Sequence, residues 1–203
     1  MTATASGISE NELWLLSFYR QSEINGALFF GRVARTLRPG ALQADVTQHF
    51  SDEAAHASYW TACIRDLGHD ALKLGGAYQD HYLDAAGVPA NLLDVLAVTQ
   101  AFEKRVIGQY HRHLRHEGTH PRVRQTLEQI MRDERWHIRY VRRAIEQMTE
   151  RFGADAVGAA LGRFAAADRE VYARHLAEHG ERMAFLLPDG SDRHDTHNPE
   201  GPT

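Results

Sequence analysis

The chain lacks the residues that several common kinds of structure require. Cys63 is the single cysteine among 203 residues, which excludes an intramolecular disulfide and any zinc or rubredoxin-type module built on Cys-x-x-Cys. No apolar run is long enough to span a bilayer, and residues 1–7 have neither the basic nor the apolar segment of a signal peptide. From these absences we expect a cytoplasmic protein without a membrane partner.

The chain also lacks an excess of positive charge. It has 23 Lys and Arg against 27 Asp and Glu, a formal net charge of −4, so we expect no nucleic-acid partner. Hydrophobic residues make up 43% and charged residues 25%, as in ordinary globular proteins. We therefore predict one folded domain over residues 1–187. Residues 188–203 have almost no apolar side chain, and we expect them to be a disordered polar tail.

Helical periodicity runs through most of the remaining sequence. Apolar residues recur at three- and four-residue spacing, and Ser9 followed by Glu12 fits a capping box that starts a helix. Breaks at Pro39-Gly40 and near Gly118 separate the periodic segments. We predict helices over residues 10–38, 41–67, 89–116, 121–151 and 154–185. Residues 69–88 are interrupted by glycines and are predicted to be a long crossover connection, weakly helical at best over 77–86.

One pattern, Asp-Glu-x-x-His-x-x-Tyr, occurs twice, beginning at Asp52 and again at Asp133. A lone glutamate precedes each copy on a helix of its own, Glu23 before the first and Glu103 before the second. Residues i and i+3 share one face of a helix. At a rise of 1.5 Å per residue, the lone glutamate and the Glu-x-x-His lie at similar distances from the turn in each predicted hairpin. We expect four carboxylates and two imidazoles to converge.

Such a set of side chains is suited to hold a pair of metal ions. Carboxylate oxygens and neutral imidazole nitrogens suit iron or manganese, and carboxylates can bridge two cations. Four negative charges against two divalent ions leave a neutral cluster, which lowers the cost of burying it. The candidate ligands are Glu23, Glu53, His56, Glu103, Glu134 and His137.

These residues resemble the ligand set of the ferritin-like di-iron carboxylate superfamily, which includes rubrerythrin, bacterioferritin and di-iron oxygenases. The resemblance covers about residues 10–152. It implies an all-α fold, a ferritin-like antiparallel four-helix bundle with a long crossover between its second and third helices. The fifth predicted helix would be an additional C-terminal helix. The implied cofactor is two iron ions, with manganese or a mixed iron–manganese pair as alternatives.

The resemblance also implies a role for each candidate ligand. Glu23 and Glu103 would be terminal ligands, Glu53 and Glu134 would be bridging ligands, and His56 and His137 would each complete one metal. Asp52 and Asp133 would accept the free N–H of the histidine from the opposite half of the chain and thereby fix its tautomer.

Three tyrosines lie close to these positions in the sequence and have two interpretations. Tyr59 and Tyr140 lie three residues after the two histidines, and Tyr19 lies four residues before the first lone glutamate. Each can be a core side chain with a satisfied hydroxyl group. Each can also be a redox-active or proton-donating phenol near the metals, which makes all three candidate catalytic residues.

The function implied by the resemblance is that of a non-haem di-iron oxidase or oxygenase, which activates O2 to oxidise a small organic substrate. Electrons would come from an external donor such as a ferredoxin or a flavin reductase. The alternative is a ferroxidase or a rubrerythrin-like peroxidase, which the absence of rubredoxin cysteines disfavours. A third hypothesis is a scaffolding bundle whose site is vestigial or holds zinc or manganese. The substrate and the oligomeric state stay open, with a homodimer among the options.

Overall fold

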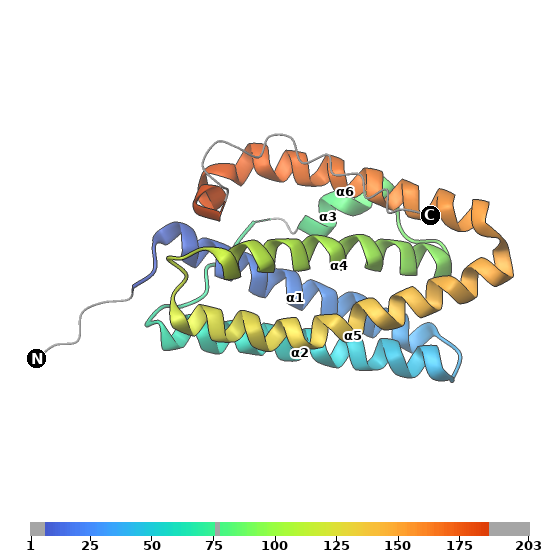
Figure 1. Cartoon of the computed structure of the whole chain (residues 1–203), viewed down its shortest axis with the longest axis horizontal. Helices are drawn as coiled ribbons and strands as arrows, with labels where there is room; N and C mark the ends of the chain where they lie inside the picture. The colour runs from blue at the N-terminus through green and yellow to red at the C-terminus, as the bar shows by residue number, and fades with distance from the viewer. Residues whose placement is uncertain (1–6, 76–77, 187–203) are drawn as a thin grey trace, which may run out of the picture.

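The computed structural model describes residues 7–75 and 78–186. They form α1 (Glu10–Thr36), α2 (Ala41–Asp66), α3 (Tyr78–Ala86), α4 (Leu92–Arg115), α5 (Pro121–Phe152), α6 (Ala154–Met183) and the short 3-10 helix η1 (Ala184–Leu186) (Figure 1). No strand occurs in these residues, so the predicted all-α class is confirmed. None of their helices is long and apolar enough to cross a membrane. The predicted tail over 188–203 lies outside the described residues.

The start of α1 shows how local sequence and tertiary contacts share control of a helix end. Ser9 Oγ accepts a hydrogen bond from the Glu12 N–H at 3.1 Å, as the capping-box pattern predicts. The Glu12 carboxylate does not complete the box. It is buried, and its Oε1 lies 3.5 Å from His113 Nε2 on α4. A contact to a distant helix therefore replaces the expected local one.

The beginning of α4 also differs from the prediction, which placed it at residue 89. The Asn91 side chain accepts a hydrogen bond from the Asp94 N–H at 3.0 Å and caps the helix, which begins at Leu92, three residues later than predicted. Asparagine is among the residues preferred at this position because its side-chain oxygen satisfies a free backbone donor.

The predicted crossover contains a helix, α3, over residues for which the sequence predicts weak helicity at best. Its side chains Tyr78 and Tyr82 are buried. The Tyr78 hydroxyl donates to Asp168 of α6, and the Tyr82 hydroxyl donates to the Phe164 carbonyl of the same helix. A nine-residue helix is too short to be stable alone, so packing on α6 stabilises it.

Replacing Tyr82 with phenylalanine is expected to destabilise the protein by about 1 kcal/mol, because the hydrogen bond to α6 is lost while the buried ring stays. The change should lower the melting temperature by about 2–4 °C in a chain of this size. Thermal unfolding followed by circular dichroism measures it. Tyr59→Phe is the matched control, since the Tyr59 hydroxyl forms no hydrogen bond within the described residues. An equal loss in both variants would contradict the role of the hydroxyl bond.

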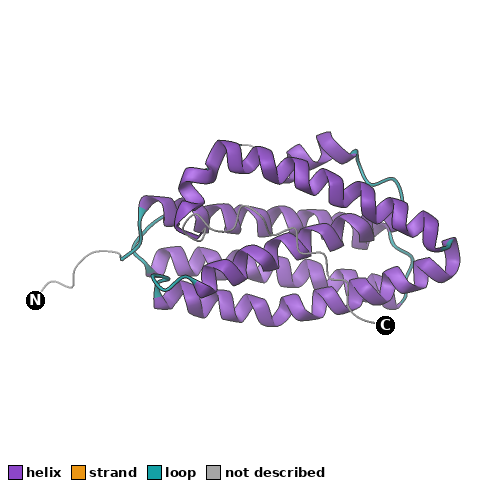
Figure 2. Ribbon diagram, turned by 45° about the horizontal axis from the view of Figure 1, so that its top comes forward, coloured by secondary structure: helices purple, strands orange, loops and turns teal. Residues whose placement is uncertain are grey.

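The helices α1, α2, α4 and α5 lie alongside one another, and α6 runs along the outside of α4 (Figure 1 and Figure 2). α1 packs closely on α2, and α5 packs on α2 and on α4. Pairs of side chains that join α2 to α5 show that these helices are antiparallel, since Arg143 contacts Asp45 and His137 contacts Asp52. The chain turns from α5 into α6 at Gly153, whose φ of 84° favours glycine.

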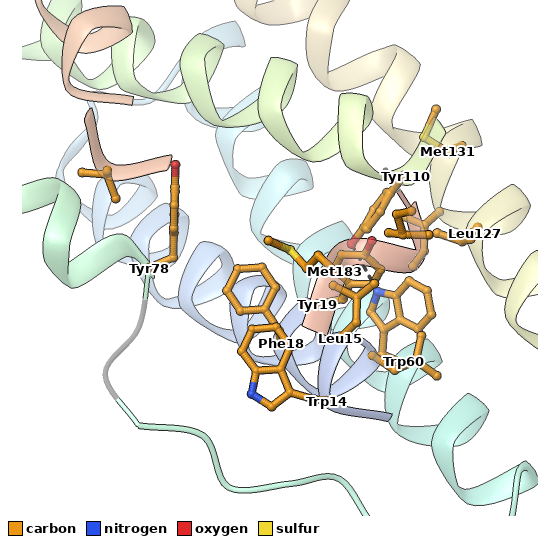
Figure 3. Close-up of a cluster of buried hydrophobic side chains, with 14 of the residues drawn as sticks. Trp14, Leu15, Phe18, Tyr19, Trp60, Tyr78, Tyr110, Leu127, Met131 and Met183 are labelled. Atoms are coloured by element: carbon orange, nitrogen blue, oxygen red, sulfur yellow. Dashed lines mark hydrogen bonds between the residues drawn. The ribbon is translucent and has the colours of Figure 1, made fainter. Parts of the chain in front are cut away.

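Two hydrophobic clusters occupy the interior on either side of a polar layer. The first gathers around Trp14, Leu15, Trp60 and Leu127, and Figure 3 shows part of it. The second gathers around Phe30, Val46, Val141 and Ala144. On α1, α2 and α5 the candidate ligands lie between the residues of the first cluster and those of the second.

Candidate metal centre

The structure brings together the side chains of all six candidate ligands. They come from four helices: Glu23 from α1, Glu53 and His56 from α2, Glu103 from α4, and Glu134 and His137 from α5. All six are buried, and the four glutamates have exposed fractions of 1–7%. An isolated carboxylate is costly to bury in this way unless it is paired, protonated or bound to a cation.

One group that could hold a metal consists of Glu23, Glu53, His56 and Glu134, with one ligand atom of each within 4.8 Å of the others. His56 Nδ1 lies 3.6 Å from Glu23 Oε2 and 3.5 Å from Glu134 Oε1. This nitrogen is buried and has no hydrogen-bond partner among the described residues. A buried, unpartnered nitrogen facing carboxylates fits the place of a metal ligand, because a cation would satisfy both.

The second group consists of His49, Glu53, Glu103 and His137. His49 Nε2 lies 3.1 Å from both Glu53 Oε1 and Glu103 Oε1. His137 Nδ1 lies 3.0 Å from Glu134 Oε2 and 3.9 Å from Glu103 Oε2. Glu53 belongs to both groups, so its carboxylate lies between two places where a cation would have three or more donors.

His49 was not among the predicted site residues. It precedes Glu53 by four residues, so the two share one face of α2. The position that corresponds to it in the second copy of the motif is Ile130, four residues before Glu134. Since the prediction rested on what the two halves share, a histidine present in only one half escaped it. The helical spacing from Glu53 was the signal that could have found it.

Asp52 and Asp133 each contact the histidine from the opposite half of the chain. His56 Nε2 lies 3.2 Å from Asp133 Oδ2, and His137 Nε2 lies 3.3 Å from Asp52 Oδ2. An N–H on each Nε2 would leave the Nδ1 of each ring as an acceptor that faces the glutamates. Burial raises the pKa of Asp52, but hydrogen bonds from His137 and Gln48 outweigh this and lower it below its ordinary value.

The carboxylates repel one another strongly in the absence of cations. Burial, followed by the charges of Glu23, Glu134 and Glu103, raises the pKa of Glu53 well above its ordinary value. Burial and the charge of Glu103 likewise raise the pKa of Glu134. Glu53 and Glu134 therefore tend to hold protons where cations are absent, and cations that bind would displace those protons.

The three histidines respond to this environment in opposite ways. Burial and the neighbouring His137 lower the pKa of His49 well below its ordinary value, so His49 is neutral. Burial also lowers the pKa of His56, but the nearby carboxylates of Glu23 and Glu134 outweigh it and raise the pKa to about 9. For His137, contacts with Asp52 and Glu134 outweigh burial and raise the pKa to about 10.

The predicted catalytic tyrosines lie at different distances from the cluster. The Tyr140 hydroxyl is 2.7 Å from His49 Nδ1, which orients the His49 ring. The Tyr59 ring centroid is 6.2 Å from that of His56. Tyr19 does not reach the ligands. Its ring packs against Tyr110, as Figure 3 shows, and its buried hydroxyl has no hydrogen-bond partner among the described residues.

Tyr110 is the phenol that contacts a candidate ligand, and the sequence pattern did not single it out. Its hydroxyl donates to Glu23 Oε1 and accepts a hydrogen bond from Trp60 Nε1 at 3.2 Å. Burial and the charge of Glu23 raise the pKa of Tyr110 well above its ordinary value, so the phenol keeps its proton. Tyr110 follows Glu103 by seven residues, two helical turns along one face of α4, which was the available signal.

A cavity of about 280 Å³ leads to the cluster between α1 and α4. All four candidate glutamates line it, together with apolar side chains such as Phe29, Phe102 and Val106. Gly26 of α1 also lines it, and a Cβ at this position would lie 2.0 Å from Glu53 Oε2. The absence of a side chain at residue 26 therefore makes room for the Glu53 carboxylate.

The donor atoms suit cations that accept both carboxylate and imidazole ligands, such as iron, manganese or zinc. The arrangement can hold two cations side by side, exclude bulk water with its apolar surroundings, and admit a small molecule through the cavity.

Comparison of the chain with protein-family models, with curated proteins and with solved structures found no significant match.

Proposed function

We propose that α1, α2, α4 and α5 form a ferritin-like four-helix bundle that holds two iron ions. On this proposal the protein is a non-haem di-iron oxidase or oxygenase that uses O2 to oxidise a small organic substrate. The observation that carries the proposal is the pair of buried donor groups that share Glu53. Each group has at least one imidazole and two carboxylates, and each group combines residues from both halves of the chain.

Bound iron would supply the electrons that reduce O2. An external donor such as a ferredoxin or a flavin reductase would then replace those electrons. The protein's own residues would hold the ligands in place. Asp52 and Asp133 direct an Nδ1 of each motif histidine toward the glutamates. The Tyr110 hydroxyl donates a hydrogen bond to the Glu23 carboxylate, and this hydrogen bond would stabilise negative charge that develops at that oxygen.

The cavity favours a protein that acts on an organic substrate over one that acts only on iron or on hydrogen peroxide. Its wall between α1 and α4 includes aromatic and aliphatic side chains beside the glutamates, as in pockets that bind small organic molecules. Such a wall also keeps water from the cluster. A ferroxidase or rubrerythrin-like peroxidase, a manganese-containing site and a scaffold with structural zinc are the alternatives that the following experiment separates.

The test is metal content together with the optical response of the anaerobic ferrous protein to O2. We expect two irons per chain and a rapid absorbance change on mixing with O2. Glu103→Ala and His137→Ala should each lose at least one metal without loss of helix content, because both residues belong to a donor group. Glu117→Ala is the matched control, since exposed Glu117 begins another Glu-x-x-His sequence that lies at a helix end.

Full metal occupancy in both site variants would refute the assigned ligands. A reaction with H2O2 that is much faster than the reaction with O2 would favour the peroxidase. One zinc per chain, or no metal, would favour the scaffold.

A further inference from the structure

The cavity beside the candidate metal centre is elongated along the helices. On α1 the lining residues extend from Phe18 to Arg32, and on α4 they extend from Val98 to Gln109. Residues three and four apart lie on one face of a helix, and the lining of each helix includes a set at this spacing. These sets are Phe18, Ser22, Asn25, Phe29 and Arg32 on α1, and Val98, Phe102, Val106 and Gln109 on α4.

The middle of the cavity is apolar. Phe29 and Phe102 line it from opposite helices, and Val106 and Tyr82 add to the wall. Phe102 and Tyr82 pack with ring centroids 4.6 Å apart, so this part of the wall is built from side chains that support one another. A molecule that fills the cavity would bury an apolar body there.

Charge is distributed unevenly along the cavity. Its inner part is lined by the four candidate glutamates, and Arg32 lines it further along α1. Arg32 is exposed and forms no ion pair or hydrogen bond with any other described residue. The other lining cation, Arg105, donates from Nε and Nη2 to Asp168, whose charge compensates it.

The surroundings of Arg32 reinforce its positive charge. Residues 24–38 contain Arg32, Arg35 and Arg38 and no aspartate or glutamate. No acidic side chain one turn before or after Arg32 on α1 is therefore present to neutralise it. This part of the cavity attracts an anion, whereas the glutamates repel one.

We propose that the cavity binds an organic monoanion with an apolar body, its anionic group at Arg32 and its apolar end toward the glutamates. This rests on the proposed function only in identifying the bound molecule as the substrate. Gly26, which adjoins Glu53, and Arg32 are six residues apart on α1, which corresponds to about 9 Å along the helix axis. The apolar body would span this distance, so the position to be oxidised lies far from the anionic group.

The probes are octanoate, 1-octanol and octylamine, which share an apolar chain and differ in the charge of the end group. Isothermal titration calorimetry with the full chain measures their dissociation constants, with and without bound metal. We expect octanoate to bind about fivefold more tightly than 1-octanol, as suits one exposed ion pair. In the metal-loaded protein, where cations compensate the charge of the glutamates, octylamine should bind most weakly, because Arg32 repels its ammonium group.

Arg32→Gln should abolish the preference for octanoate over 1-octanol and leave the affinity for 1-octanol unchanged. Arg35→Gln is the matched control, since it removes the same charge from the same helix at a position that does not line the cavity. Val106→Trp should weaken binding of both ligands, because the larger side chain would fill the cavity between Phe29 and Phe102. The helix content of this variant checks that it is folded.

Equal binding of octanoate and 1-octanol by the unaltered protein would overturn the proposal, as would equal effects of Arg32→Gln and Arg35→Gln. Unchanged binding by a folded Val106→Trp variant would place the ligand outside this cavity and overturn it too. The two proposals fail separately. Octanoate preference without metal binding would leave this inference standing and remove the di-iron centre, whereas two bound irons without octanoate preference would do the reverse.

Discussion

Gly26→Ala is expected to remove at least one of the two metal ions that we propose the protein binds, while the fold remains intact. A Cβ at residue 26 would lie 2.0 Å from Glu53 Oε2 and 3.0 Å from Glu53 Cδ, so the carboxylate must rotate away. Alanine is otherwise favourable inside a helix, and the displaced atoms are the far end of a flexible side chain. Because Glu53 belongs to both donor groups, its displacement weakens both places for a cation.

The loss in metal affinity should be on the order of 10- to 100-fold, the range found when the support of a ligand is removed. Metal titration and metal analysis of the purified variant measure it. Gly108→Ala is the matched control, because a Cβ at that position of α4 would have no atom within 4 Å. That variant should gain about 0.4–1 kcal/mol of stability and keep both metals. Wild-type metal affinity in Gly26→Ala would show that Glu53 is not a ligand.

The parts of the structure that the sequence predicted are those that depend on local pattern or on duplication. Apolar spacing and the breaks at Pro39 and Gly118 located the long helices. The duplicated motif and the lone glutamates located six side chains that the structure brings together, and the crossed contacts of Asp52 and Asp133 with the two histidines were expected from the same duplication. Their role as metal ligands stays a prediction.

The parts that the sequence did not predict depend on contacts between distant segments. His49 and Tyr110 lie outside the duplicated motif, and only their packing against Glu53, Glu103 and Glu23 distinguishes them from other core residues. The helix α3 forms where tyrosines anchor it to α6, although its own propensity is weak. The Glu12 carboxylate turns toward His113 for the same reason. In each case a tertiary contact decided between conformations that the local sequence allowed.

Removing metal is expected to make the stability of the protein fall as the pH rises. The pKa values of Glu53 and Glu134 are raised in the folded chain, so above the ordinary value of 4.5 the folded state holds protons that the unfolded state has released. The pKa values of His56 and His137 are raised to about 9 and about 10. The stability that these histidines contribute is fully present below pH 6.5 and is lost as the pH rises through 9 to 10.

Both kinds of group therefore act in the same direction, because the folded metal-free state binds more protons than the unfolded state. His49 acts in the opposite direction, since its pKa is lowered, but only below about pH 6.5, where an unfolded histidine takes up a proton. The decline should thus be clearest between pH 6.5 and 10. A shift of one pKa unit corresponds to about 1.4 kcal/mol, so the combined effect should lower the melting temperature by many degrees.

The measurement is thermal unfolding of chelator-treated and anaerobic ferrous protein at pH 6.5, 8 and 9.5. Cations take the place of the protons, so the metal-loaded protein should depend less on pH, and the stabilisation by metal should grow as the pH rises. Glu53→Gln removes one carboxylate with a raised pKa at nearly constant shape and should flatten the decline of the metal-free protein. A melting temperature of the metal-free protein that stays constant or rises over this range would contradict the proton occupancy of the cluster. With it would fall the argument that bound cations replace the protons held by Glu53 and Glu134.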